Sequence, residues 1–188
     1  LLKLCLHLFT INTYEVHRDA LLYYSLGDHP DWGFVSVPPF IAVISAFSTS
    51  LFGNNAFALR IFPALIGTLS VVIVARLVKE FKGSFVALMI ALSAFVFSPA
   101  FLRTNSLFQP VCFNQFFWLL SGYLIIRLIN SQNQKIWIPL FITWGIAFLN
   151  KYSITFFIVA FFIALLLTEN RKLLKSKYFV TGAVISLI

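Results

Sequence analysis

Charged residues are scarce in this 188-residue sequence, and acidic residues are scarcer still. Asp, Glu, Lys and Arg fill 11% of the positions, and only six of them are acidic. A soluble domain carries roughly 25% charged residues, so this chain has too few to cover a water-exposed surface. Apolar residues make up 60% of the chain and the mean hydropathy is +0.93. The composition indicates an integral membrane protein.

Cysteine and glycine patterns exclude several other classes of site. Cys5 lies in an apolar run and Cys112 at a predicted outer loop, so we expect no disulfide between them. Zinc-type cysteine spacing, a glycine-rich nucleotide motif and internal repeats are all absent from the sequence. The net charge of +8 is divided among breaks between apolar runs rather than gathered on one face. Nucleic acid is therefore not an expected partner.

Long apolar runs alternate with short polar breaks along the chain. A membrane-spanning helix needs about 20 largely apolar residues. The runs that predict spans are 57–78, 85–102, 113–129, 136–149 and 152–168, with partial spans at 1–11 and 180–188. Because the sequence lacks an initiating Met and both ends fall inside apolar runs, we interpret residues 1–188 as the N-terminal part of one transmembrane domain, truncated at both ends. His7, in the first run, is expected to be packed and neutral.

Basic residues gather in three of the breaks and predict the topology. These clusters lie at 76–82, 127–135 and 171–177, and the positive-inside rule places them in the cytoplasm. Residues 38–53 then decide the side on which the preceding polar loop lies. This segment is short, begins with Pro38-Pro39 and contains four hydroxyl residues, which favours an interfacial or re-entrant helix over a span. Residues 14–56 are thus predicted to form a first extracytoplasmic loop that carries juxtamembrane helices.

Four of the six acidic residues lie in that loop, at Glu15, Asp19, Asp28 and Asp31. Ionisable groups concentrated in one part of a polytopic membrane protein are typical of a functional site. His17-Arg18-Asp19 imitates the catalytic loop of protein kinases. However, Tyr24 occupies the position of the required Asn, and no glycine-rich loop or Asp-Phe-Gly is present, so a kinase is excluded.

A series of short motifs, in a fixed order and spacing, runs through nearly the whole chain. They are His17–Tyr24, Gly27–His29, Trp32–Val35, Pro38-Pro39, Leu51–Gly53, Ala58–Ala64, Phe108–Trp118 and Leu149–Ser153. Together they resemble glycosyltransferase family 39, which includes dolichyl-phosphate-mannose protein mannosyltransferases and the lipid A aminoarabinose transferase. The resemblance implies an all-α polytopic membrane protein with a GT-C-type transmembrane helix bundle. It also implies transfer of a sugar from a polyprenyl-phosphate-linked donor to a lipid, glycan or protein hydroxyl at the extracytoplasmic membrane face.

By this resemblance Asp19 matches the first residue of the family's Asp-Glu pair. We expect it to be the catalytic base of an inverting displacement, which accepts the proton of the acceptor hydroxyl. Arg18, Arg103 and Lys151 are candidate cations for the departing phosphate. Two alternatives stay open: Arg18 could pair locally with Glu15 or Asp19, and the other two could extend toward the interface from helix ends.

Further candidate substrate-binding residues lie around these. They are His17, Tyr23, His29, Asp31, Trp32, Gln109, Asn114 and Tyr152. The aromatic residues could stack on sugar or anchor the loop at the interface, while Gln109 and Asn114 could bind substrate or end a helix. His17 and His29, with the neighbouring aspartates, could bind a divalent cation or form ordinary hydrogen bonds. We assign no metal site, and the cofactor remains unknown.

The sequence departs from the family pattern at three positions. Ala20 replaces the Glu of the acidic pair, Asn114 replaces an acidic residue, and Val37 replaces the His of His-Pro-Pro. These changes leave two alternatives, a lipid-linked sugar flippase or transporter and a non-catalytic membrane protein of the same fold. Ion-coupled transport is disfavoured because no acidic residue interrupts a predicted span. We expect a multi-pass protein of the bacterial inner membrane whose active loop faces the periplasm or exterior.

Overall fold

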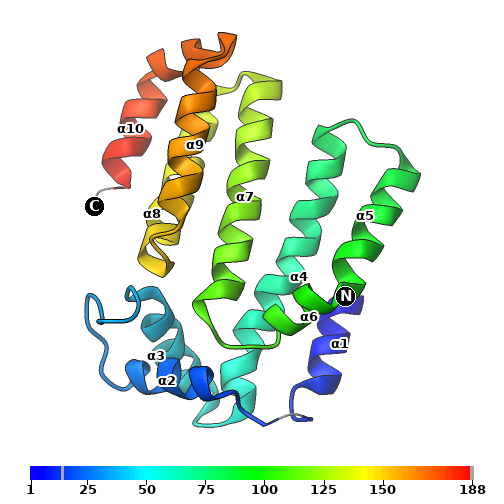
Figure 1. Cartoon of the computed structure of the whole chain (residues 1–188), viewed down its shortest axis with the longest axis vertical. Helices are drawn as coiled ribbons and strands as arrows, with labels where there is room; N and C mark the ends of the chain where they lie inside the picture. Colours follow the sequence, from blue (N-terminus) through cyan, green and yellow to red (C-terminus); the bar gives the residue numbers. More distant parts are fainter. Residues whose placement is uncertain (14, 187–188) are drawn as a thin grey trace.

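The structure is a computed structural model that describes residues 1–13 and 15–186. Its regular elements, within those residues, are all helical and include no strand (Figure 1). They are α1 (Leu2–Thr10), α2 (Arg18–Gly27), α3 (Phe40–Phe52), α4 (Ala56–Glu80), α5 (Phe85–Phe97), α6 (Pro99–Thr104), α7 (Pro110–Ser131), the 3-10 helix η1 (Gln134–Ile136), α8 (Trp137–Asn150), α9 (Ile154–Leu166), the 3-10 helix η2 (Glu169–Lys175) and α10 (Lys177–Ile185). The predicted all-α class is confirmed.

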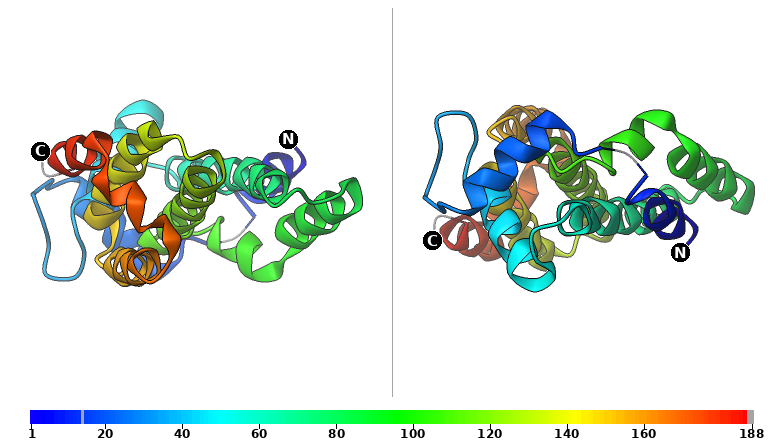
Figure 2. Two further views of the ribbon diagram at one scale, coloured as in Figure 1. Left: turned by 90° about the horizontal axis from the view of Figure 1, so that it is seen from above. Right: turned by 90° about the horizontal axis from the view of Figure 1, so that it is seen from below.

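The longer helices form a bundle, and two short helices cross one end of it. α4 packs against α7, α5 and α1, while α8 packs against α7 and α10. α2 packs on α3, which also contacts α4 and α8. α2 and α3 lie together at the lower end of the bundle in Figure 1 and in front of it in the view from below in Figure 2.

Among the described residues, two helices are long and apolar enough to cross a membrane, namely α4 and α7. They confirm the predicted spans at 57–78 and 113–129. Helix α9 and η2, which are bent by 112° at the break between them, would make a third span if taken as one. These helices agree with the composition in making the chain an integral membrane protein.

The other predicted spans are shorter than expected. Residues 85–102 are divided into α5 and α6, because Ser98 is extended and Pro99 cannot donate the hydrogen bond that would continue the helix. Residues 136–149 form η1 and the 14-residue α8, and residues 152–168 contain the 13-residue α9. Helices of this length reach about 20 Å, less than the roughly 30 Å of a bilayer core. The partial spans at the chain ends contain α1 and α10, and residues 187–188 lie outside the described residues.

The polar connections of the bundle separate into two ends. The turns after α4, α7 and α9, which carry the three basic clusters, lie at the upper end in Figure 1. There Asn130 Nδ2 donates to the Glu80 carbonyl oxygen at 2.9 Å and so ties two of these turns together. The acidic residues of α2 and the loop after it lie at the opposite end. The helices thus hold the basic and acidic parts of the chain apart.

Trp137 organises the core between α8, α9 and α10. Its side chain is completely buried, and its Nε1 donates to the Leu173 carbonyl oxygen at 3.1 Å. Five aromatic rings pack around it, those of Phe141, Trp144, Phe161, Phe162 and Phe179. Since these rings come from three helices, Trp137 fixes how that half of the bundle packs.

Replacing Trp137 by alanine is expected to destabilise the bundle strongly. The substitution leaves a cavity among the five rings and an unpaired Leu173 carbonyl, which together cost about 3–5 kcal/mol. Thermal unfolding of the purified protein in detergent would show a clearly lowered midpoint. Phe156→Ala, at a ring that is 78% exposed on α9, is the matched control and should change the midpoint little; an equal effect of the two substitutions would contradict this packing.

Candidate active site

Helix α2 begins at the predicted catalytic motif. His17 is its N-cap residue: the backbone is extended there, and His17 Nδ1 accepts a hydrogen bond from the Asp19 backbone N–H at 3.3 Å. Asp19 lies in the first turn, where a negative charge is favoured by the helix dipole. Because Nδ1 accepts this bond, the proton of the neutral His17 ring is on Nε2. The cap therefore fixes both His17 and Asp19 at the start of α2.

Close packing against α3 sets the position of α2. A side chain at Gly27 would bring its Cβ to 2.7 Å from Ser45 Cβ, so glycine is needed for this approach. Ser45 Oγ donates to the Tyr24 carbonyl oxygen at 3.2 Å, and Ala20 is buried in the core. α2 thus presents Ala20 inward.

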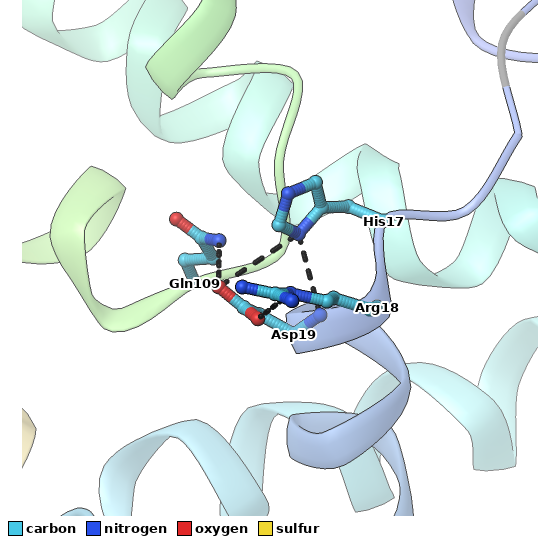
Figure 3. A network of polar contacts seen from close by, with 4 residues as sticks. All are labelled: His17, Arg18, Asp19 and Gln109. Carbon is cyan, nitrogen blue, oxygen red and sulfur yellow. Dashed lines mark hydrogen bonds and ion pairs between the residues drawn. The ribbon is translucent and has the colours of Figure 1, made fainter.

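The Asp19 carboxylate accepts one side-chain hydrogen bond and has two further polar side chains beside it (Figure 3). Gln109 Nε2 donates to Asp19 Oδ2 at 3.1 Å, and Arg18 Nε lies 3.4 Å from Oδ1. His17 Nδ1 lies 3.8 Å from Oδ2. The Asp19 side chain remains 43% exposed, so a substrate hydroxyl can reach it. The arrangement suits a carboxylate that accepts a proton from an incoming group.

Tyr23 lies one turn beyond Asp19 on the same face of α2. Burial raises the pKa of the Tyr23 phenol, and the negative charge of Asp19 raises it further. The ring therefore stays neutral at physiological pH and keeps its hydroxyl proton. Near Asp19 it can serve as a hydrogen-bond donor or an apolar surface.

Gln109 comes from a distant part of the sequence. It is the N-cap residue of α7 and precedes Pro110; its backbone is extended and its side chain makes no capping hydrogen bond. The neighbouring Phe108 is 1% exposed and anchors the turn. The sequence predicted that Gln109 binds substrate or ends a helix. In the structure it stands before α7 and its side chain contacts Asp19.

Asn114, Lys151 and Tyr152 gather around the start of α9. Ser153 Oγ donates to Asn114 Oδ1 at 3.4 Å, which joins α9 to α7. Lys151 and Tyr152 are exposed, and the Tyr152 ring lies 4.8 Å from Phe148. No hydrogen bond or ion pair joins these three to Asp19 within the described residues. The start of α7 and the α8–α9 turn, which carry them, lie at the same end of the bundle as α2 (Figure 1).

His29, Asp31 and Trp32 follow the other end of α2. The ten-residue α2 is about 15 Å long, and Asp19 lies in its first turn, so most of the helix separates them from Asp19. Asp31 Oδ1 accepts a hydrogen bond from the Trp32 backbone N–H at 2.7 Å, and Trp32 is 89% exposed beside a cavity of about 500 Å³ next to α3 and α8. Among the described residues, no three His, Cys, Asp or Glu side chains gather as metal ligands would. The candidate residues thus form separate groups.

A larger cavity, of about 780 Å³, lies on the α1 side of the Asp19 cluster. His17, Arg60 and Arg103 line it, and Arg103 lies in the last turn of α6. Arg60 Nη2 donates to the Glu15 carbonyl oxygen at 2.8 Å, and Nη1 donates to that of Ile11. Sequence reasoning missed Arg60 as a site residue. A single arginine within an apolar span was the available signal, because such residues usually have a functional or structural partner.

Comparison with protein families gives a match over most of the chain. The family described as dolichyl-phosphate-mannose-protein mannosyltransferase matches residues 36–188, which include α3 to α10. The match starts after α2, so the roles of His17, Arg18 and Asp19 rest on their own geometry and on the resemblance of their motif. Comparison with curated proteins and with solved structures gives no match. Because the matched range is most of the sequence, the chain belongs to the dolichyl-phosphate-mannose-protein mannosyltransferase family.

Proposed function

We propose that this protein transfers a sugar from a polyprenyl-phosphate-linked donor to an acceptor hydroxyl, with Asp19 as the base. Membership of the mannosyltransferase family supports the reaction type. The observation that carries the role of Asp19 is its half-exposed carboxylate, held by Gln109 and bordered by Arg18. The exposed side of this carboxylate leaves room for an acceptor hydroxyl.

The chemistry is an inverting displacement at the anomeric carbon. The acceptor hydroxyl gives its proton to an Asp19 oxygen while its own oxygen bonds to the anomeric carbon. The bond from that carbon to the phosphate oxygen breaks, and its electron pair leaves with the polyprenyl phosphate. Phosphate is a good leaving group, so a general acid is less necessary. A positioned base contributes roughly 10²–10⁴-fold to such a step.

Cations near the phosphate assist its departure. Arg18 is 91% exposed, so its contact with Asp19 is weak and its guanidinium can turn toward a phosphate. Arg103 lines the large cavity, which His17 connects to the Asp19 cluster. Lys151 lies at the α8–α9 turn and does not line that cavity. It is a candidate ligand of a more distant part of the donor or acceptor. Arg18 and Arg103 are the principal phosphate ligands in this proposal.

The proposal places α2 and α3 on the extracytoplasmic side, which would be the periplasmic face of a bacterial inner membrane. The three basic turns lie at the opposite end of the bundle and would face the cytoplasm (Figure 1). Residues 14–56 would then be the first extracytoplasmic loop, with α3 at the interface. Lipid-linked sugars are used on that side in the family that the sequence resembles.

A flippase or a non-catalytic relative would have the same fold. The replacement of the family's glutamate by Ala20 keeps these alternatives open. Ala20 is 4% exposed, so a glutamate there would need either a buried partner or a shifted helix. Both alternatives predict that the protein works without breaking the bond between the sugar and the phosphate. The effect of an Asp19 substitution on sugar transfer therefore distinguishes a transferase from both of them.

Asp19→Asn is expected to reduce sugar transfer by about 10²–10⁴-fold, because the amide cannot accept the acceptor proton. It retains an oxygen for Gln109, so the abundance of the protein in the membrane should not change. Transfer from a radiolabelled polyprenyl-phosphate sugar in isolated membranes measures the effect. Asp28→Asn, the same change at the exposed C-terminal end of α2, is the control and should transfer normally. Turnover at the wild-type rate by the Asp19 variant would remove Asp19 from the mechanism.

Gln109→Leu is expected to lower kcat roughly tenfold or more with little change in the donor KM. The variant removes one hydrogen bond to a charged carboxylate, so Asp19 loses its orientation while the donor site is untouched. Gln109→Glu should lower kcat further, since a second carboxylate within hydrogen-bond distance repels Asp19. Gln134→Leu, an exposed glutamine at the opposite end of the bundle, serves as the control. A change in KM alone would show that Gln109 binds substrate and does not position the base.

A further inference from the structure

His17 meets Asp19 through a single ring nitrogen. His17 Nδ1 accepts a hydrogen bond from the Asp19 backbone N–H at 3.3 Å, and the same Nδ1 lies 3.8 Å from Asp19 Oδ2 (Figure 3). One nitrogen is therefore close to both a backbone donor and a carboxylate acceptor. Which of the two it binds depends on whether it carries a proton.

The neutral ring caps α2. An unprotonated Nδ1 has a lone pair that accepts the backbone hydrogen bond, and it has no hydrogen to give to the carboxylate. Asn, Asp, Ser or Thr would give the same kind of cap. The imidazole adds to this cap a group of the kind that ordinarily changes its charge between about pH 5 and 8.

Protonation reverses the role of Nδ1. The nitrogen then carries a hydrogen, so it can no longer accept from the Asp19 N–H and becomes a charged donor. A small turn of the ring would shorten its distance to Oδ2 to the roughly 2.8 Å of a charged hydrogen bond. The His17 side chain is 35% exposed, so water can deliver and remove the proton.

The Asp19 carboxylate has few acceptor positions to spare. Each carboxylate oxygen offers about two lone-pair sites, and Gln109 Nε2 takes one of those on Oδ2 at 3.1 Å. Arg18 Nε borders Oδ1 at 3.4 Å. A protonated His17 would take the second site on Oδ2, and its charge would make the carboxylate a weaker base. An acceptor hydroxyl would then lose both the position and part of the driving force for giving up its proton.

Other charged or titratable side chains surround His17 on several segments. Those that border Asp19 or line the same cavity are His7 on α1, Glu15, Arg18, Tyr23, Arg60 on α4 and Arg103 on α6. Within this set, only His7 is of the same residue type as His17. The two histidines must therefore be separated by experiment.

We propose that His17 controls whether Asp19 can act as the base of sugar transfer: the neutral ring caps α2 and leaves the carboxylate free, whereas the protonated ring binds the carboxylate and withdraws it from the acceptor. This role rests on the proposed function of Asp19. His17 acts through Asp19 and is a positioning residue. Because the proposed function places α2 on the extracytoplasmic side, transfer would respond to the pH of that side.

His17→Asn separates the two states of the ring, since asparagine keeps the cap but cannot gain a charge. Transfer from a radiolabelled polyprenyl-phosphate sugar by the full-length protein would be measured at about pH 5 and about pH 8, the two ends of the range for histidine. The ratio of kcat at acid pH to kcat at alkaline pH should be roughly tenfold higher in the variant than in the wild type, because the charged hydrogen bond to Asp19 is lost. Equal ratios would overturn the proposal.

The other two histidines among residues 1–188 provide the controls. His7→Gln changes the histidine that lines the same cavity, and His29→Asn makes the same substitution at an exposed position beyond the far end of α2. Each variant should keep the wild-type ratio of the two rates. A raised ratio in the His7 variant, with an unchanged ratio in His17→Asn, would assign the pH dependence to His7 and contradict the role of His17.

A measurement without transfer keeps the two proposals apart. In full-length protein with isotopically labelled aspartate, the Asp19 amide resonance is identified by its absence from the Asp19→Asn spectrum. Between about pH 8 and about pH 5 it should move in the wild type, as the bond to Nδ1 is lost, and stay in His17→Asn. Such movement without any transfer would overturn only the transferase. An Asp19 amide that does not move in the wild type would overturn the role of His17.

Discussion

The exclusion of charge from the apolar faces of the helices is the constraint on which this structure depends. Six acidic and 14 basic residues must be placed in a chain that is 60% apolar, and most of them lie at the ends of the bundle. The basic turns after α4, α7 and α9 occupy one end, and the acidic residues of α2 and its following loop occupy the other (Figure 1). Unpaired charges within the bilayer would be costly. The same separation that makes the fold stable therefore also places the acidic residues of α2 and its following loop at one end of the bundle.

Helix α2 cannot hold itself in place, because it has only ten residues. Two contacts compensate: Gly27 and Ser45 let it lie closely against α3, and Gln109 reaches across from the start of α7 to Asp19. The second contact also orients the proposed base. A single hydrogen bond thus connects the stability of the short helix with the chemistry of its carboxylate, and α7 is long enough to provide a rigid support.

Composition and run length were sufficient to predict a helical membrane protein and the spans in α4 and α7. They overestimated the lengths of other spans, because hydropathy does not register the break at Ser98-Pro99 or the short turns that delimit α8 and α9. The motif at Asp19 was visible, but its contact with Gln109 joins residues 90 positions apart and depends on tertiary packing. Arg60 belongs to the motif Ala58–Ala64, but its neighbours in the sequence do not indicate that its guanidinium binds the segment before α2. His7 was predicted to be packed and is buried, whereas the burial of Asn105 depends on its close approach to Gly67 in α4 and had no signal in the sequence.

The sidedness of α2 tests the central claim of this account most directly. In a full-length protein that lacks Cys5 and Cys112, a single cysteine would replace Ser25, which is exposed on α2, or Ser131, which is exposed at the opposite end of the bundle. Intact cells would then be treated with a membrane-impermeant thiol reagent. Labelling at position 25 and protection at position 131 would place Asp19 on the extracytoplasmic side, as predicted. The reverse pattern would place α2 in the cytoplasm and contradict a transferase that uses lipid-linked sugars at the outer face.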